Sequence, residues 1–143
     1  MPYTYLENIA VADAAFEAQG ATREELFAAA AEATLREMIA NPEGLQPREL
    51  RRILLGPDSL DLLLYHFLQE LIFFKDSEQL LLVVREIRIR ETAQGYLLEA
   101  EAAGETLDPQ RHELAADVKA VTMHRFGVRQ IAGGWQATVV LDI

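Results

Sequence analysis

The C-terminal stretch reads as two strands joined by a tight turn. Its two arms, Asp117–His124 and Trp135–Ile143, are rich in valine and threonine, and the pair Gly133-Gly134 precedes the second arm. Such side chains fit a pleated, half-buried surface, and glycine takes the positive φ that a tight hairpin turn needs. Apolar side chains in the second arm alternate onto one face, namely Trp135, Ala137, Val139 and Leu141. The pattern predicts a long antiparallel hairpin as the scaffold of the chain.

Two aspartates stand out against apolar surroundings. Asp142 and the α-carboxylate of Ile143 end the second arm, and Asp13 interrupts the apolar segment Val11–Phe16. The simpler interpretation places each aspartate on a solvent face or at a strand end. If both lie at the same end of one sheet, their hard oxygen atoms would select Ca²⁺ or Mg²⁺ over a softer metal.

Composition restricts the classes of protein and partner. The chain has 143 residues, which fits a single domain spanning 1–143. Its net charge of −10 argues against strong direct nucleic-acid binding and favours a cation or a basic protein as partner. Without cysteine it can form neither disulfides nor thiolate metal sites. Neither a signal peptide nor a membrane-spanning segment is apparent, so we expect a cytoplasmic protein with no membrane partner.

Periodicity predicts two helices. Thr22-Arg23-Glu24-Glu25 is a capping box, and apolar side chains then recur at helical spacing until Asn41-Pro42 ends the helix. The segment Leu45–Leu55 fits a short helix or a strand. Asp58 is expected to cap a second helix, whose apolar face runs from Leu60 to Ile72.

The remaining segments predict strands. Tyr3–Glu7 is short and extended, Ile9–Gln19 is weakly strand-like, and the period changes from helical to two after Glu78. A strand at Leu81–Arg90 and a return strand at Tyr96–Ala103 precede the C-terminal hairpin. The sum is an α+β fold of two layers, with two helices packed on one face of a mostly antiparallel sheet.

Motifs of known enzyme classes are missing from the sequence. The three histidines, His66, His112 and His124, show no spacing that would place two imidazoles on one metal. No GxSxG, P-loop or GxGxxG motif occurs, and no nucleophile–base pair is visible. We therefore expect a protein that is not an enzyme, and a metal-dependent hydrolase is disfavoured.

Several segments together resemble the archease family over essentially the full length of the chain. The similarity lies in Asp13 with Ala18-Gln19-Gly20, in the capping box at Thr22, and in Val118–His124 and Val139–Ile143. Further pieces are Asp58 with Asp61-Leu62-Leu63, Phe67–Leu71, and Gly104-Glu105 with Asp108 and Arg111-His112. The family usually has His-Thr-Ala-Asp where Ala10-Val11-Ala12-Asp13 stands here, and a tyrosine in place of Met123.

The resemblance implies an archease-like protein that activates the tRNA-splicing RNA ligase. Members are understood to promote guanylylation and multiple turnover of that ligase without being ligases themselves. Their metal site corresponds to Asp13, Asp142 and Ile143, with Ca²⁺ the first choice and Mg²⁺ or Mn²⁺ as alternatives. Three residues of the polar motif before the last hairpin are further candidates for activating the partner: Arg111, Asp117 and Lys119. A rival hypothesis is a chaperone-like or general protein-interaction module that uses its acidic surface without a metal.

Overall fold

The structure is a computed structural model that describes residues 2–6 and 13–143. The helices and strands within these residues follow in the order β1 (Tyr3–Leu6), β2 (Asp13–Gly20), α1 (Arg23–Met38), a 3₁₀ turn η1 (Pro42–Gly44), β3 (Glu49–Asp58), α2 (Leu60–Glu78), β4 (Leu80–Thr92), β5 (Gly95–Thr106), β6 (Ala120–Ile131) and β7 (Gly134–Asp142). The element types that the sequence predicted at both helices and in the C-terminal hairpin are confirmed. The segment Leu45–Leu55, which fitted either a helix or a strand, contributes to a strand.

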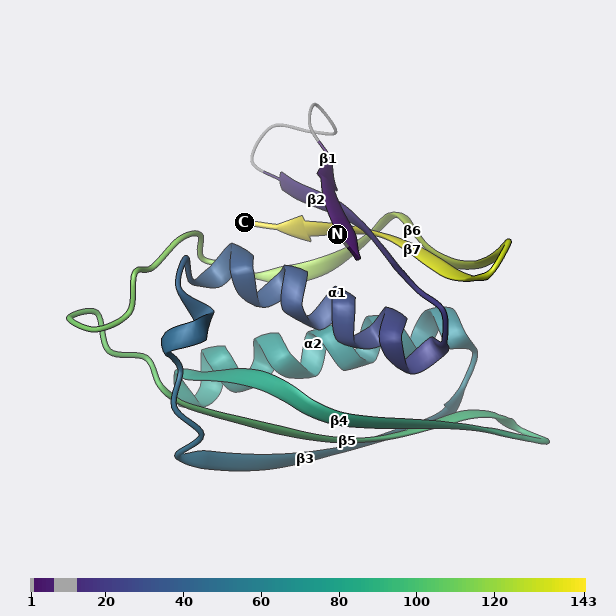
Figure 1. The fold of residues 1–143 in the computed structure, drawn as a ribbon, viewed down its shortest axis with the longest axis horizontal. Helices are drawn as coiled ribbons and strands as arrows, with labels where there is room; N and C mark the ends of the chain where they lie inside the picture. The colour runs from purple at the N-terminus through teal and green to yellow at the C-terminus, as the bar shows by residue number, and fades with distance from the viewer. Residues whose placement is uncertain (1, 7–12) are drawn as a thin grey trace.

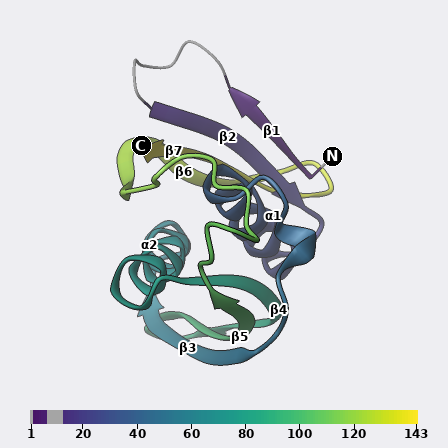
Figure 2. The ribbon, with the colours of Figure 1, turned by 90° about the vertical axis from the view of Figure 1, so that its left-hand side faces the viewer.

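The strands form two antiparallel sheets with the helices between them (Figures 1 and 2). One sheet has the order β1-β2-β7-β6 and the other has the order β3-β5-β4. The α+β class with mostly antiparallel strands is confirmed, but the helices do not lie on one face of a single sheet. The molecule therefore has three layers where two were expected.

Burial around most of the circumference of α1 explains the third layer. Its buried side chains point in several directions and are Leu26, Phe27, Ala29, Ala30, Ala31, Ala33, Thr34, Leu35 and Met38. A helix that is apolar on more than one side must be covered on more than one side, and α1 contacts both β2 and β4. One core cluster, with Phe16, Phe27 and Phe67 fully buried, joins the helices to both sheets.

The capping box forms at the start of α1, but one of its two hydrogen bonds has a different donor from the expected one. The Thr22 hydroxyl accepts a hydrogen bond from the Glu25 N–H at 3.1 Å, as expected. The Glu25 carboxylate accepts from the N–H of Ala21 at 2.9 Å, one residue before the cap. The local sequence therefore fixes the start of this helix.

The cap of α2 differs from the prediction. Asp58 is the last residue of β3, and the Ser59 hydroxyl accepts from the N–H of Leu62 at 3.3 Å. The strand continues through Pro57 because β3 is an edge strand, where a missing N–H can cost no ladder hydrogen bond. None of the helices in the described residues is both long and apolar enough to cross a membrane.

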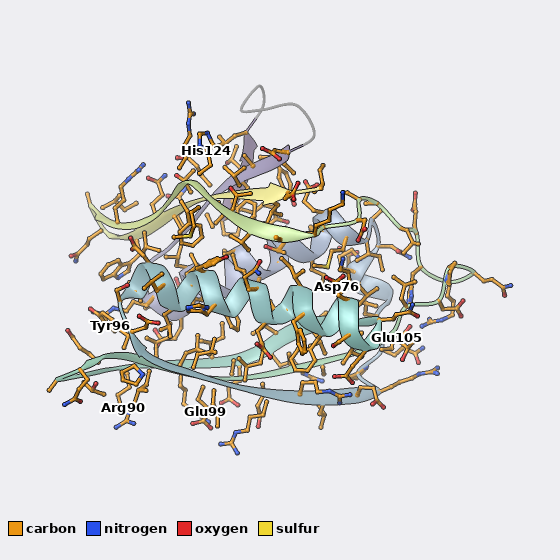
Figure 3. All side chains as sticks on the ribbon, turned by 180° about the vertical axis from the view of Figure 1, so that it is seen from behind. Asp76, Arg90, Tyr96, Glu99, Glu105 and His124 are labelled. Atoms are coloured by element: carbon orange, nitrogen blue, oxygen red, sulfur yellow. The ribbon has the colours of Figure 1, made fainter. Side chains whose placement is uncertain are left out.

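The C-terminal hairpin forms with a break in its register. Gly133 has the positive φ, 81°, that the turn requires. Thr122 pairs with Val140, but the next pair is Gly127 with Thr138, so residues 123–126 of β6 bulge outward opposite Val139. His124 lies on this bulge, on the side of the sheet away from α2 (Figure 3).

Candidate functional site

Asp13 and Asp142 face each other across two neighbouring strands. They are direct Cα partners in the antiparallel pairing of β2 with β7. Residues directly opposite in such a pair point to the same face, with Cβ atoms about 4.5–5.5 Å apart. The two carboxylates, which come from opposite ends of the chain, therefore share one end of one sheet.

The pair lies on the outer face of the four-stranded sheet. Phe16 and Ala18 alternate with Asp13 along β2 and are fully buried toward the helices, so the side chain of Asp13 points the other way. Asp142 is exposed and Asp13 is half-buried. A ligand on this face could reach both carboxylates from solvent.

The surroundings of the pair suit a cation. Within the part of the chain that the structure describes, neither carboxylate has a lysine, arginine or histidine nitrogen within ion-pair distance. Like charges directly opposite each other in a sheet are unfavourable, and a bound divalent cation would remove that repulsion. Carboxylate oxygens are also the ligands that Ca²⁺ and Mg²⁺ prefer.

A third ligand would have to come from outside the acidic and imidazole side chains of the described residues. Among these, no group of three or more such side chains is placed to hold a metal ion. Ile143 follows Asp142 directly and is half-buried. The residues present therefore fit two aspartate side chains supplemented by a main-chain oxygen.

The three further candidates lie in three different environments. The backbone N–H of Lys119 donates to the carbonyl of Asp142 at 2.8 Å, which places Lys119 beside the aspartate pair. Asp117 accepts from Lys75, and Arg111 is paired with Glu105. The structure thus brings Lys119, but neither Arg111 nor Asp117, into direct contact with the carboxylate end of the sheet.

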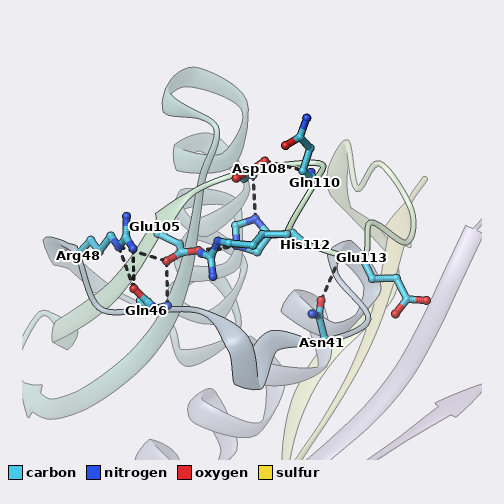
Figure 4. A network of polar contacts seen from close by, with 9 residues as sticks. Asn41, Gln46, Arg48, Glu105, Asp108, Gln110, His112 and Glu113 are labelled. Carbon is cyan, nitrogen blue, oxygen red and sulfur yellow. Dashed lines mark hydrogen bonds and ion pairs between the residues drawn. The ribbon is translucent and has the colours of Figure 1, made fainter.

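Through its ion pair with Glu105, Arg111 joins a polar network. Figure 4 shows this network, which holds the loop between β5 and β6. At its centre is Glu105, which is only 4% exposed. Its carboxylate accepts from Nε2 of His112 at 2.5 Å and from the backbone N–H of Gln46 at 3.1 Å. Arg111 supplies the main opposing charge. The network ties the loop to β5 and to the segment before β3.

Asp117 belongs to a second cluster, at the C-terminal end of α2. Nζ of Lys75 donates to Asp117 and to the carbonyl of Val118, at 2.8 and 2.6 Å. Burial lowers the pKa of Lys75, but the carboxylates of Asp117 and Asp76 outweigh burial and leave that pKa raised. The same contact lowers the pKa of Asp117. Asp117 therefore fixes the chain just before Lys119 and β6.

His112 is neutral in the folded protein. Its Nδ1 accepts from the backbone N–H of Asp108 at 2.8 Å, which requires an unprotonated nitrogen there. Burial and the Arg111 guanidinium lower the pKa of His112 from its ordinary 6.5, against the opposing charge of Asp108. At a pH between the lowered pKa of the folded protein and the ordinary value of 6.5, unfolding is therefore accompanied by uptake of a proton by His112.

This linkage predicts a loss of stability on mild acidification. The contribution of His112 is fully present above pH 6.5, the ordinary value, and is lost as the pH falls from there through the lowered folded-state pKa. Melting temperatures between pH 8 and pH 5.5 should fall in the wild type and fall less in His112→Gln. The exposed His124 provides the control, His124→Gln, which should keep the wild-type slope. An unchanged slope in His112→Gln would contradict the assignment.

Neither Glu105 nor Lys75 was among the candidate site residues predicted from the sequence, although Glu105 stands in one of the segments that carry the family resemblance. For Lys75 a signal existed, because it follows Leu64, Leu68 and Leu71 at helical spacing and so lies on the apolar stripe of α2. A lysine on such a stripe predicts a buried partner. Glu105 gave no comparable signal, since it stands in a polar segment whose burial depends on the loop that covers it.

Comparison with known proteins found one matching family and relatives that are similar over nearly the whole chain. The model of the Archease protein family matches residues 3–143. A protein archease of Thermococcus kodakarensis is 37% identical over 133 residues, which cover 92% of this chain and 93% of the relative. One of Methanopyrus kandleri is 33% identical over 143 residues and covers both chains completely.

Two solved structures share the fold. The solution structure of Methanobacterium thermoautotrophicum protein 1598 superimposes with a TM-score of 0.85, at 32% identity over 99% of both chains. The crystal structure of an archease, described as a possible chaperone, from Thermotoga maritima gives a TM-score of 0.65 at 19% identity. It covers 96% of this chain and 97% of its own. This second similarity bears on the fold alone.

Proposed function

Because the chain belongs to the archease family, we propose that it is a non-enzymatic protein cofactor of the tRNA-splicing RNA ligase. In this role it promotes guanylylation of the ligase and its multiple turnover in tRNA splicing and RNA repair. Such a partnership would place its site of action in the cytoplasm. The observation that supports the proposal most directly is the cross-strand pair of Asp13 with Asp142.

The site would take a divalent cation, with Ca²⁺ preferred and Mg²⁺ or Mn²⁺ as alternatives. The carboxylates of Asp13 and Asp142 and the α-carboxylate of Ile143 would hold it. A bound cation supplies positive charge, which is the usual means of offsetting the charge of phosphate groups in nucleotidyl transfer. The chain itself would position the cation, because both aspartates belong to paired strands and the Lys119 N–H fixes the carbonyl of Asp142.

The three further candidates would act in two ways. Lys119 would contact the partner or its nucleotide beside the aspartate pair. Arg111 and Asp117 would act indirectly, by holding the loop that leads into β6 through Glu105 and Lys75. Substituting either should therefore lower the stability of the loop, and should lower the stimulation of the ligase only at temperatures where the loop unfolds.

Reconstitution with the ligase from the same organism tests the proposal. We expect the purified protein, with Ca²⁺ present, to raise the rate of ligase guanylylation and to convert single-turnover ligation into multiple turnover. Matched reactions would contain EDTA or no added protein. A guanylylation rate that does not respond to the protein would refute the proposal.

A chaperone-like activity is the second candidate, and one observation favours it. Leu50 and Leu54 are 70% and 64% exposed on the face of β3 that points away from the helices. Exposed apolar side chains of this size can hold unfolded segments of other proteins. If this activity is the function, the protein suppresses aggregation of an unrelated unfolded protein, and Asp142→Asn does not change that suppression.

A further inference from the structure

A groove opens along one flank of the molecule, between the edges of the two sheets. It has a volume of about 570 Å³ and is lined on one side by Pro2, just before β1, and by Gln19 of β2. On the other side it is lined by Leu82, Val83 and Val84 of β4. Residues of α1, among them Ala28 and Glu32, form its floor. The groove is on the side of the molecule where β1, α1 and β4 lie together (Figure 2).

The wall that β4 provides is an unpaired strand edge. β4 is the last strand in the order β3-β5-β4, so every second backbone N–H and C=O points away from β5. Further along β4 this edge is covered, because the Glu24 carboxylate accepts from the N–H of Ile89 at 3.1 Å. Bare strand edges are where another chain adds most readily, and proteins usually protect them.

Inside the groove the edge has no such protection. Every second N–H of β4 points away from β5, as that of Ile89 does. The bulge between Val84 and Glu86 adds one residue to β4 and shifts this alternation by one. Before the bulge, the outward N–H groups are therefore those of Val84 and Leu82. Within the described residues, no side chain or loop is hydrogen-bonded to either group. The unprotected part of the edge is therefore the part that lies beside the floor of α1.

The rim of the groove is acidic. Glu25, Glu32 and Glu43 line it together with one arginine, Arg36, which is bonded to Glu43. Glu25 and Glu32 take part in none of the ion pairs found among the described residues. An occupant that carries lysine or arginine would complement this rim, whereas an acidic one would be repelled.

We propose that this groove is the docking site for an extended, basic segment of the RNA ligase, which adds to the edge of β4 as a further strand. The inference rests on the proposed function, and it specifies the surface of that same partnership. RNA-binding proteins carry clusters of lysine and arginine, which match the glutamates of the rim. Backbone hydrogen bonds to Leu82 and Val84 give affinity in this mode of recognition, and pockets for alternate side chains give specificity.

Two substitutions test the groove directly. Ala28→Arg places a long cationic side chain on its floor, at an exposed position of α1 where arginine is a good helix former. Val84→Pro removes an outward N–H and leaves the pairing with β5 intact. Ala93→Arg, at the exposed turn between β4 and β5, makes the same chemical change away from the groove and serves as the matched control.

The measurement is the Kd for the RNA ligase, with stimulation of guanylylation measured at saturating protein. We expect Ala28→Arg and Val84→Pro to weaken binding by about tenfold or more, with wild-type stimulation recovered at saturation and Ala93→Arg unchanged. Wild-type affinity in both groove variants would overturn the inference and leave the proposed function intact. A wild-type protein that neither binds nor stimulates the ligase would overturn both. Loss of self-association in Ala28→Arg, with unaltered ligase binding, would assign the groove to a second copy of this chain and overturn the inference.

Discussion

The substitution Asp142→Asn is expected to abolish the stabilisation of the fold by Ca²⁺ and the stimulation of the ligase together. A ligand at a hundred times its Kd stabilises a protein by about 2.7 kcal/mol, which for a domain of this size is a rise in melting temperature of roughly 10 °C. Wild-type protein should show a rise of this order when EDTA is replaced by millimolar Ca²⁺. The variant should show little or none.

Comparing the stability of the wild type and the variant in EDTA gives a second test of this prediction. Without a cation, the carboxylates of Asp13 and Asp142 repel each other across the strand pair. Asp142→Asn should therefore be as stable as the wild type in EDTA, or more stable by a few tenths of a kcal/mol. When Ca²⁺ is added, the wild type would become the more stable of the two proteins.

A second acidic pair provides the control. Glu101 faces Glu86 across β5 and β4, but Arg88 is bonded to Glu86 at 3.2 Å. Glu101→Gln should leave both the response to Ca²⁺ and the stimulation of the ligase at wild-type levels. If Asp142→Asn still gains stability from Ca²⁺, the aspartate pair is not the metal site.

The substitution Glu105→Ala is expected to destabilise the fold by about 3 kcal/mol, the cost of breaking a buried charged network. It removes the acceptor for the Nε2–H of His112, which is 3% exposed, and for the N–H of Gln46. Buried donors without an acceptor cost about 1–3 kcal/mol each. Urea or thermal unfolding measures the loss.

The exposed Glu113 provides the matched control for this prediction. Its side chain makes no hydrogen bond or ion pair among the described residues. Its backbone N–H donates to Oδ1 of Asn41 and its carbonyl accepts from the N–H of Ala40, and a change of side chain leaves both bonds in place. Glu113→Ala should change stability by less than about 0.5 kcal/mol. A loss of similar size in both variants would show that the loop, rather than the carboxylate of Glu105, determines the effect.

These expectations separate stability from function. Glu105→Ala should lower the melting temperature and leave ligase stimulation intact at low temperature, where the loop remains folded. Asp142→Asn should abolish ligase stimulation and leave the melting temperature in EDTA unchanged or slightly raised. Variants of Arg111 and Asp117 should resemble Glu105→Ala, because these side chains are bonded to Glu105 and Lys75 rather than to the aspartate pair.

Local sequence determined the elements and their ends. Thr22 and Glu25 fix the start of α1 through hydrogen bonds within five residues, and Gly133 fixes the turn of the last hairpin through its positive φ. Such features depend on neighbours along the chain, so they can be read from it directly. The error in this class, the cap at Asp58, arose because β3 continues to Asp58 as an edge strand and leaves Ser59 to cap α2.

Tertiary structure decided how the elements meet. The pairing of Asp13 with Asp142, the burial of Glu105 and Lys75, and the division of the strands into two sheets all join segments far apart in the chain. Register between distant strands is set by the summed packing of their apolar faces, since a slip of one residue would turn every side chain to the wrong side. The sequence by itself determined which residues could serve as cation ligands, and only the packed sheet determined that two of them face each other.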